Sequence, residues 1–387
     1  MTLLIYGAYG YTGELIAEEA VDRGVDTVVA GRDAVETEHL AERLCCEGRP
    51  FDVDAAAEHL DDVDACLNCA GPFVDTYEPL VEACLDTGTD YLDITGELAV
   101  FEAIAERDRE AETAGVCLLP GVGFDVVPTD CVAGHLHDRL PEATELRLGF
   151  DPDGGVSAGT LRSALEHAGA GGRVRRDGEI VDVPTAHRSR RIDFGRGERN
   201  AVAIPWGDIS TAYYTTGIGN VEVYAAMPKS VERALRVGRP AAPLLDVGPV
   251  KRTLQSLADV AVSGPSARRR ERGACYVWGE ATDDETTVTT RLETPETYAF
   301  TVDAATTAAR RILDGDQEGF QNPGVGAHTR VRARPRCRRW LSRRVTRSAE
   351  RGLPVRPLPS SRRFPGRPPA HIGVVVRVAA NLAATRM

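Results

Sequence analysis

A glycine-rich segment close to the N-terminus has the spacing with the clearest chemical consequence. Its residues are Gly7, Ala8, Tyr9, Gly10, Tyr11, Thr12 and Gly13. This is a G-x-G-x-x-G pattern with alanine in the first glycine position and one more glycine before it. Residues 3–6 predict a strand before the turn, and residues 12–23 predict a helix after it. Such a turn lets the backbone approach a diphosphate, which the N–H groups at the helix start stabilise. A dinucleotide site is therefore expected, and a plain strand-to-helix turn is the alternative.

The end of the second expected strand, residues 27–30, indicates which dinucleotide is bound. Gly31, Arg32 and Asp33 follow this strand. Enzymes that use NAD place an acid here to bind the ribose 2′-hydroxyl, whereas an arginine suits a 2′-phosphate. Arg32 therefore favours NADP over NAD, with an exposed loop arginine as the alternative. Asp33 is explained by an N-cap of the next helix.

Polar residues also follow two later strands of the same half. Asn68, Ala70 and Gly71 lie after one strand, and Asp93 and Glu97 lie after the next. Open α/β sheets bind ligands at the carboxyl ends of their strands. We expect Asn68 to bind a ribose, with space left by Ala70 and Gly71, and Asp93 to position substrate or nicotinamide. Turn formation and helix capping explain Asp93 and Glu97 equally well.

Hydride transfer also needs a proton donor near the acceptor. The side chains that could lie at the expected domain junction are Asp125, Asp130, His167, Asp208, Tyr213 and Tyr214. Asp125, Asp208 and Tyr213 are the catalytic candidates among them. A helical histidine is more often structural, and the two tyrosines could instead pack within a strand. The histidines lack paired ligand spacing, so no metal is predicted.

The order of elements predicts an α/β protein, with a Rossmann-type doubly wound parallel sheet and a second α+β domain. Strands and helices alternate through residues 1–125, which implies parallel strands and right-handed crossovers. Strand-like runs dominate residues 126–300, the expected substrate or dimerisation domain. Helices are predicted over residues 98–114, 161–167, 250–262 and 302–313, and a late hairpin around Asp283 and Asp284.

Several segments together resemble the saccharopine dehydrogenase-like oxidoreductases, and most closely their trans-acting enoyl reductase branch. The segments are residues 7–13, 30–32, 68–73, 91–97, 120–130, 205–211 and 276–280. The resemblance covers about residues 3–323. It implies a nicotinamide-dependent reductase of lipid-like or acyl (enoyl) substrates, with residues 301–323 returning as a helix to the first domain.

Two other functions are compatible with these residues. A saccharopine-type amino-acid dehydrogenase would need arginines for substrate carboxylates. Arg162 and Arg173–Arg176 are the nearest, although the latter look like an exposed hairpin edge. A non-catalytic NADP-binding scaffold or sensor would keep the cofactor site alone. A homodimer is a further expectation.

The charge is distributed unevenly. The last 60 of the 387 residues hold 16 arginines, no lysine and one acid, whereas residues 1–327 hold 30 basic and 57 acidic residues. An acid-rich chain with two lysines suits a high-salt cytoplasm, where ions screen the repulsion. No apolar run or leader-like start predicts a membrane span or signal peptide, so a soluble cytoplasmic protein is expected. The nine scattered cysteines do not suggest a disulfide scaffold. The CxxC pair Cys66 and Cys69 is interpreted as buried, inert thiols, with a redox pair or half a metal site as the alternatives.

Residues 324–387 depart from the family pattern. This Arg- and Pro-rich tail is expected to be disordered, and an altered reading frame is the preferred explanation for it. A basic arm that binds nucleic acid or anionic lipid is the alternative. Because no aromatic residues or motif organise the arginines, nucleic acid is not the expected partner.

Overall fold

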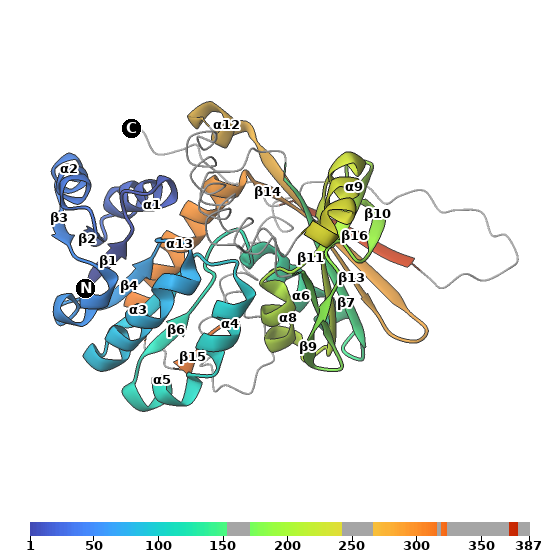
Figure 1. Ribbon diagram of the computed structural model, residues 1–387, viewed down its shortest axis with the longest axis horizontal. Coiled ribbons are helices and arrows are strands. Elements are labelled where there is room, and N and C mark those ends of the chain that lie inside the picture. Colours follow the sequence, from blue (N-terminus) through green and yellow to red (C-terminus); the bar gives the residue numbers. More distant parts are fainter. Residues whose placement is uncertain (153–170, 242–265, 316–318, 323–370, 378–387) are drawn as a thin grey trace, which may run out of the picture.

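The computed structural model describes residues 1–152, 171–241, 266–315, 319–322 and 371–377. Two sheets lie next to each other, with helix α13 (Thr297–Leu313) between them (Figure 1). The first sheet is parallel and the second is mixed. The predicted α/β fold, a doubly wound parallel sheet followed by a second domain, is confirmed.

The first sheet has the order β15-β6-β5-β4-β1-β2-β3. Its strands are β1 (Thr2–Tyr6), β2 (Asp26–Gly31), β3 (Glu47–Pro50), β4 (Ala65–Asn68), β5 (Asp90–Asp93), β6 (Cys117–Leu119) and β15 (Gly319–Phe320). The chain leaves β1 first toward β3 and then returns to β4 on its other side. The strand order therefore reverses between β1 and β4, the point where such sheets bind ligands.

Helices cover both faces of this sheet, and the alternation of β1 assigns its residues to the two cores. Leu3 and Ile5 pack with residues of α1, α2 and α13, whereas Leu4 and Tyr6 pack with residues of η1, α3, α4 and α5. The helices are α1 (Tyr11–Asp22), α2 (Ala34–Leu44), η1 (Val53–His59), α3 (Phe73–Thr87), α4 (Leu98–Ala105) and α5 (Asp108–Ala114). The α13 helix and β15 come from the C-terminal side of the second domain. They close the first domain, as the pairing of β15 with β6 shows.

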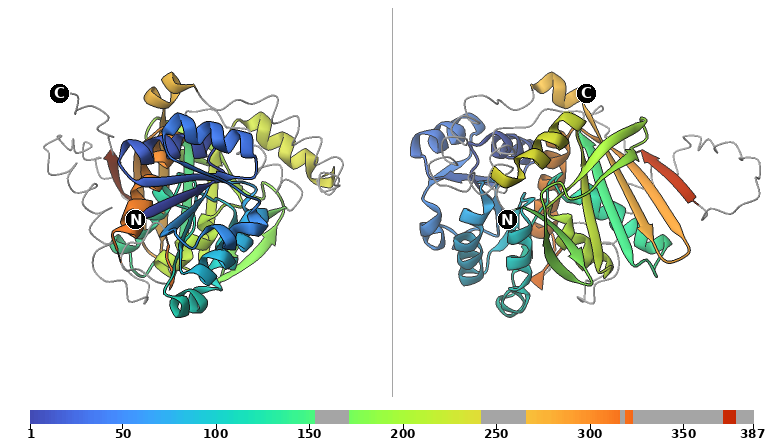
Figure 2. Two further views of the ribbon diagram at one scale, coloured as in Figure 1. Left: turned by 90° about the vertical axis from the view of Figure 1, so that its left-hand side faces the viewer. Right: turned by 45° about the vertical axis from the view of Figure 1, so that its right-hand side comes forward.

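The second sheet has the order β10-β11-β12-β7-β13-β14-β16, with β8 paired to β12 and β9 paired to β8. Its strands are β7 (Glu145–Pro152), β8 (Gly172–Arg176), β9 (Glu179–Val183), β10 (Ser189–Asp193), β11 (Glu198–Ile204), β12 (Asn220–Ala226), β13 (Ala274–Thr282), β14 (Thr287–Pro295) and β16 (His371–Arg377). Figure 2 shows its long strands edge to edge. Asp177 and Gly178 join β8 to β9 with φ of 50° and 86°, a conformation typical of tight hairpins.

One face of the second sheet is covered by α6 (Val127–Arg139) and α8 (Asp208–Thr216). Arg291 of β14 donates a hydrogen bond of 2.6 Å to the carbonyl of Asp193 in β10, the first strand of the order. The sheet is therefore curved, since these two strands are far apart in the strand order. Its other face therefore holds a small core around Tyr224 and Trp278. Three further helices follow β12, namely α9 (Lys229–Gly238), η2 (Arg239–Ala241) and α12 (Ala267–Arg272).

Four sequence predictions are wrong. Tyr213 and Tyr214 lie in helix α8 rather than in a strand. The helix predicted over residues 98–114 is two helices, which meet near Arg107. Arg175 is buried, with 3% of its surface exposed, and does not lie on an exposed edge. Residues 371–377 form β16 beside β14, so this part of the tail is not disordered.

Other predictions fall outside the described residues. These are the helices expected over 161–167 and 250–262, with His167 and Arg162, and the remainder of the tail. In the described ranges, no helix combines the length and apolar character needed to span a membrane.

Candidate functional site

The glycine-rich loop forms a tight cradle between β1 and α1. Gly7 has φ +75°, and its N–H donates to the Ala30 carbonyl at 2.8 Å. A Cβ atom on Gly13 would lie 2.4 Å from the Gly7 carbonyl oxygen, and one on Gly7 would lie 2.8 Å from Ala70. Side chains are therefore excluded at both positions. Helix α1 starts at Tyr11, and its N-cap, the exposed Gly10, has no side chain with which to cap the first-turn N–H groups. This arrangement fits a diphosphate.

Arg32 lies at the carboxyl end of β2 with its side chain exposed to solvent. Across the described part of the chain, no group forms an ion pair or a hydrogen bond with it. Its neighbour Asp33 caps α2, because its carboxylate accepts hydrogen bonds from the N–H groups of Val35 and Glu36, which confirms the predicted N-cap. The ring of Tyr9 lies against Gly31, where a Cβ would be 2.4 Å from a ring carbon. Arg32 is thus an available cation beside the glycine loop.

Asn68 lies at the end of β4, next to the glycine loop, and is fully buried. Its Oδ1 accepts from the Ala70 N–H at 2.9 Å, and its Nδ2 donates to Thr76 Oγ1 at 3.0 Å and to the Tyr91 hydroxyl at 3.4 Å. The side chain therefore shapes the loop that packs against Gly7. A ribose contact by Asn68 itself stays a prediction.

Asp93, at the end of β5, connects two loops of the same edge. Its Oδ1 accepts from the N–H groups of Thr95 and Gly121, at 2.9 and 2.7 Å, and its Oδ2 accepts from the Tyr91 hydroxyl at 3.0 Å. Burial raises the pKa of Asp93 to about 7, although these hydrogen bonds oppose the shift. The fully buried carboxyl therefore holds the loops after β5 and β6 together. A direct role toward the nicotinamide is untested.

Glu97 caps a helix that lies 24 residues earlier in the chain. Its two carboxylate oxygens accept from the N–H groups of Phe73 and Val74, in the first turn of α3, at 3.1 and 3.0 Å. A negative charge at a helix N-terminus is stabilised by the helix dipole. Sequence reasoning proposed capping by Glu97 but could not identify the helix, because the partner is distant in sequence.

Asp125 is the candidate acid with the properties of a proton donor. Its side chain is partly exposed, and within the described ranges no donor forms a hydrogen bond with its carboxylate. Burial, and secondly the charge of Glu97, raise the pKa of Asp125 to about 7. The carboxylate lies against the loop after β5, since a Cβ on Gly96 would be 2.9 Å from Asp125 Oδ2. Its backbone carbonyl accepts from Trp206 Nε1 at 2.6 Å, which ties this loop to the second domain.

Asp208 and Tyr213, the other catalytic candidates, both lie in helix α8 and have different surroundings from Asp125. Asp208 is fully buried at the start of α8, and burial raises its pKa well above the usual range. The neighbouring Asp130 and Asp125 raise that pKa further. Tyr213 packs under the guanidinium of Arg175, 4.2 Å from its ring centroid. Of the two candidate acids, Asp125 is partly exposed and Asp208 is not, whereas the ring of Tyr213 is in contact with Arg175.

Aromatic side chains of both domains cluster around Phe124, the neighbour of Asp125 in the chain. Phe124 makes edge-to-face contacts with Phe150 and Phe300, at centroid distances of 6.3 and 5.9 Å. The ring of Trp206 lies 5.3 Å from that of Phe150. Trp206 and Phe300 remain partly exposed. The junction beside the acid is thus largely apolar.

Comparison with known proteins agrees with this geometry. Residues 3–119 match the family described as the saccharopine dehydrogenase NADP binding domain. The N-terminal domain belongs to this family. A mouse saccharopine dehydrogenase-like oxidoreductase is 27% identical over 55% of this chain and 58% of its own length. A Mycobacterium tuberculosis protein, provisionally named a trans-acting enoyl reductase, is 29% identical over 42% of this chain and 43% of its own. The chain thus spans about half the length of these curated relatives, 58% of the first and 43% of the second.

A solved structure shows the same fold over both domains. Saccharopine dehydrogenase (L-Glu forming) from Saccharomyces cerevisiae aligns over 90% of this chain and 98% of its own, with a TM-score of 0.58 and 13% identity. For the N-terminal domain, the match of residues 3–119 confirms the family expected from the sequence motifs.

The NADP-binding domain is joined to the second domain by a contact that the sequence did not reveal. Arg175 of β8 donates to Glu102 of α4 at 2.7 Å, and also to the backbone carbonyls of Gly178 and Ile209. Ser210 of α8 donates to the same Glu102 carboxylate at 2.5 Å. This partly buried ion pair fixes the second domain against the first domain beside the carboxyl edge of the sheet.

Other parts of the chain contribute less to this site. Two cavities, of about 250 and 410 Å³, are lined by residues of the second sheet and of the α1–β3 region, away from Asp125. In the ranges that the structure describes, no cluster of His, Cys, Asp or Glu could hold a metal ion. Cys66 is a buried free thiol, and burial raises the pKa of Cys69 far above its usual value, so both fit the predicted inert thiols.

Proposed function

We propose that this protein is an NADP(H)-dependent oxidoreductase that reduces a lipid-like acyl substrate, with Asp125 as the proton donor. The observation that carries the cofactor assignment is Arg32, an exposed and unpaired arginine, in the described ranges, beside a glycine loop that excludes side chains. A bound NADPH would supply the hydride. The loop of residues 7–13 would hold the diphosphate with main-chain N–H groups, and Arg32 would bind the 2′-phosphate.

The properties of Asp125 support its proposed role in the proton transfer that accompanies hydride transfer. Reduction of an enoyl group adds a hydride to one carbon and a proton to its neighbour. A carboxylic acid whose pKa is about 7 is half protonated at neutral pH, which suits a general acid. Because it is partly exposed, Asp125 can reach a substrate at the domain junction, whereas the fully buried Asp208 cannot.

The surroundings of Asp125 favour an apolar substrate over an amino acid. The partly exposed rings of Trp206 and Phe300 offer apolar surface beside the acid. The arginines expected for substrate carboxylates that fall within the described residues are already paired: Arg173 with Asp182, Arg175 with Glu102, and Arg176 with Glu222. These pairings speak against a saccharopine-type amino-acid dehydrogenase. The name of the mycobacterial relative also supports an enoyl substrate.

A cofactor titration and an acceptor panel test this proposal. NADPH should bind more tightly than NADH at the protein's preferred salt concentration, and it should be oxidised in the presence of an enoyl acyl thioester. Turnover with imines formed from amino acids, but not with enoyl substrates, would support the amino-acid dehydrogenase instead. Tight NADPH binding without oxidation by enoyl, keto or imine acceptors would identify a non-catalytic scaffold or sensor. Absence of dinucleotide binding would overturn all three.

A further inference from the structure

We propose that Arg270, in helix α12 of the second domain, binds the diphosphate of the dinucleotide together with the glycine loop of the first domain. This inference rests on the proposed function and adds a phosphate-binding residue from a different domain. The contact that suggests it is a hydrogen bond from Arg270 Nη1 to the Tyr11 hydroxyl, at 2.9 Å. Tyr11 is the first residue of α1 and belongs to the glycine motif itself.

The Tyr11 side chain is held in place from two sides. Its ring makes an edge-on contact with Tyr298 of α13, at a centroid distance of 5.1 Å. Tyr298 is fixed in turn, because the buried Glu296 carboxylate caps the start of α13 and accepts from the Tyr298 N–H at 2.9 Å. The guanidinium of Arg270 also lies over the Tyr11 ring, with Cζ 5.7 Å from its centroid. Arg270 is therefore positioned at the entrance of α1.

The positive charge at the start of α1 indicates that Arg270 interacts with an anion. The N-terminus of α1 carries the positive end of the helix dipole, and Arg270 adds positive charge beside it, which favours the binding of an anion. Helix α12 has the sequence ARRRER, which holds four arginines and one acid. A diphosphate placed at the glycine loop would neutralise both the dipole and the Arg270 charge. Helix α12 packs on α13 and β14, which anchor it to both domains.

The two arginines should recognise different parts of the ligand. Arg32 follows β2, where the 2′-phosphate of NADPH is expected, and this group is absent from NADH. Arg270 lies at the start of α1, where the diphosphate is expected, and this group is present in both dinucleotides. Loss of Arg270 should therefore weaken the binding of NADPH and NADH by the same factor.

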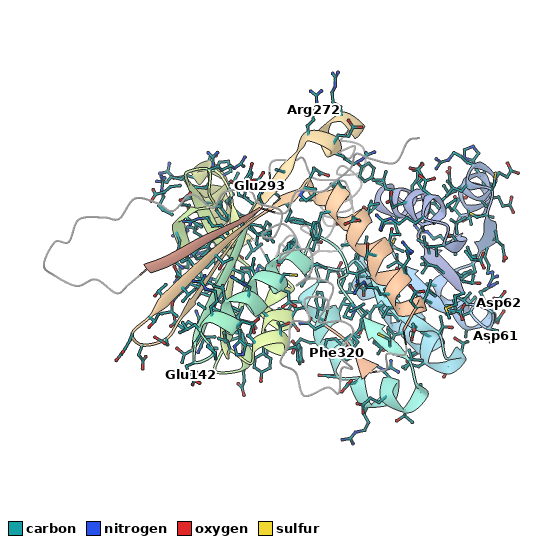
Figure 3. All side chains as sticks on the ribbon, turned by 180° about the vertical axis from the view of Figure 1, so that it is seen from behind. Asp61, Asp62, Glu142, Arg272, Glu293 and Phe320 are labelled. Carbon is teal, nitrogen blue, oxygen red and sulfur yellow. The ribbon has the colours of Figure 1, made fainter. Side chains whose placement is uncertain are left out.

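Titration of the full-length Arg270→Gln protein with NADPH and with NADH, at one fixed salt concentration, tests this assignment. Loss of a charge-assisted hydrogen bond to phosphate should raise both dissociation constants about tenfold or more. Arg272→Gln is the matched control, because Arg272 is exposed on the same helix and points away from the protein in Figure 3. It should change both constants less than about twofold, since exposed charges are strongly screened.

The outcomes separate this inference from the proposed function. Unchanged affinity in Arg270→Gln, with normal binding by the wild type, overturns the role of Arg270 alone. Equal losses in Arg270→Gln and Arg272→Gln also overturn it, because they indicate a general charge effect. A loss for NADPH only would move Arg270 to the 2′-phosphate and contradict the diphosphate assignment. If the wild type binds neither dinucleotide, the proposed function fails first. Tyr11→Phe, which keeps the arginine, should lose less affinity than Arg270→Gln.

Discussion

At the scale of a single residue, the proposed preference for NADPH over NADH depends on Arg32. We expect Arg32→Ala to weaken NADPH binding about ten- to hundredfold, because a charge-assisted hydrogen bond contributes about 1.5–3 kcal/mol. NADH binding should change less than about twofold, because NADH lacks the 2′-phosphate. Fluorescence titration measures both constants. Arg233→Ala is the control, since Arg233 is exposed on α9 and its loss changes the net charge equally. A similar loss with both dinucleotides would contradict the assignment.

Also at the residue scale, the ionisation of Asp125 should determine how the rate of the proposed reaction depends on pH. The acid must be protonated to donate, so the reductase rate should be highest below the pKa of about 7 and fall about tenfold per pH unit above it. Asp125→Asn should slow the reaction at least about a hundredfold at pH 6.5 without weakening NADPH binding. Asp61→Asn, at an exposed position far out on the first domain in Figure 3, should match the wild type.

The pH dependence of the free energy of unfolding gives a second test of the raised pKa of Asp125. The folded protein keeps the Asp125 proton until about pH 7, whereas an unfolded chain releases it near pH 4. This acid therefore makes the free energy of unfolding decrease as the pH rises between those two values. Asp125→Asn should remove that part of the decrease, so its inactivity cannot be attributed to unfolding. If Asp125→Asn were less stable than the wild type at pH 8, this would argue against a raised pKa of Asp125 in the folded protein.

At the scale of an element, α3 depends on a cap supplied by another loop. Glu97→Ala removes both acceptors of the Phe73 and Val74 N–H groups and should lower the free energy of unfolding by about 1–3 kcal/mol. Glu97→Gln keeps one acceptor and should lose less. Urea unfolding measures the difference, with Glu78→Ala, exposed on the same helix, as the control.

Glu97 also connects helix α3 with the proposed proton donor, Asp125. Its charge contributes to the raised pKa of Asp125, so Glu97→Gln should move the alkaline limb of the pH–rate profile to lower pH. An unshifted limb, together with a destabilised α3, would show that Glu97 acts only as a cap.

The same scale shows what sequence can predict. The parallel strands were predictable, because runs such as residues 3–6 are buried on both faces and read as continuous apolar segments. Helix α8 was missed because Thr and Tyr favour strands, and only packing against α6 and β12 makes it helical. The glycine loop and Arg32 were predictable from spacing. Arg270 was not, since α12 lies 259 residues beyond Tyr11 and only the fold brings them together.

At the scale of the whole molecule, three separate contacts join the two domains around the proposed site. The Arg175–Glu102 ion pair lies on one side, Trp206 is bonded to the Asp125 carbonyl, and Arg270 reaches Tyr11. Each contact pairs a first-domain loop or helix with a second-domain residue. The cofactor loop and the acid are therefore held in a fixed relation by the second domain, which is what hydride and proton transfer to adjacent atoms requires.

The acidic surface leads to a prediction about the molecule as a whole. Residues 1–327 hold 30 basic and 57 acidic residues, so the folded state suffers from self-repulsion at low salt. The Debye length falls from about 10 Å at 0.1 M salt to about 3 Å at 1 M, which removes most of the repulsion between exposed carboxylates. We expect the unfolding temperature to rise by several degrees from 0.1 to 2 M KCl, most steeply in the first half of that range. Calorimetry measures it, and sucrose of equal osmolality is the control for effects unrelated to charge. A flat response to KCl, or an equal response to sucrose, would contradict adaptation of this surface to a high-salt environment. The Arg270 contact should weaken under the same conditions less than a surface ion pair, because its partner Tyr11 is partly buried and uncharged.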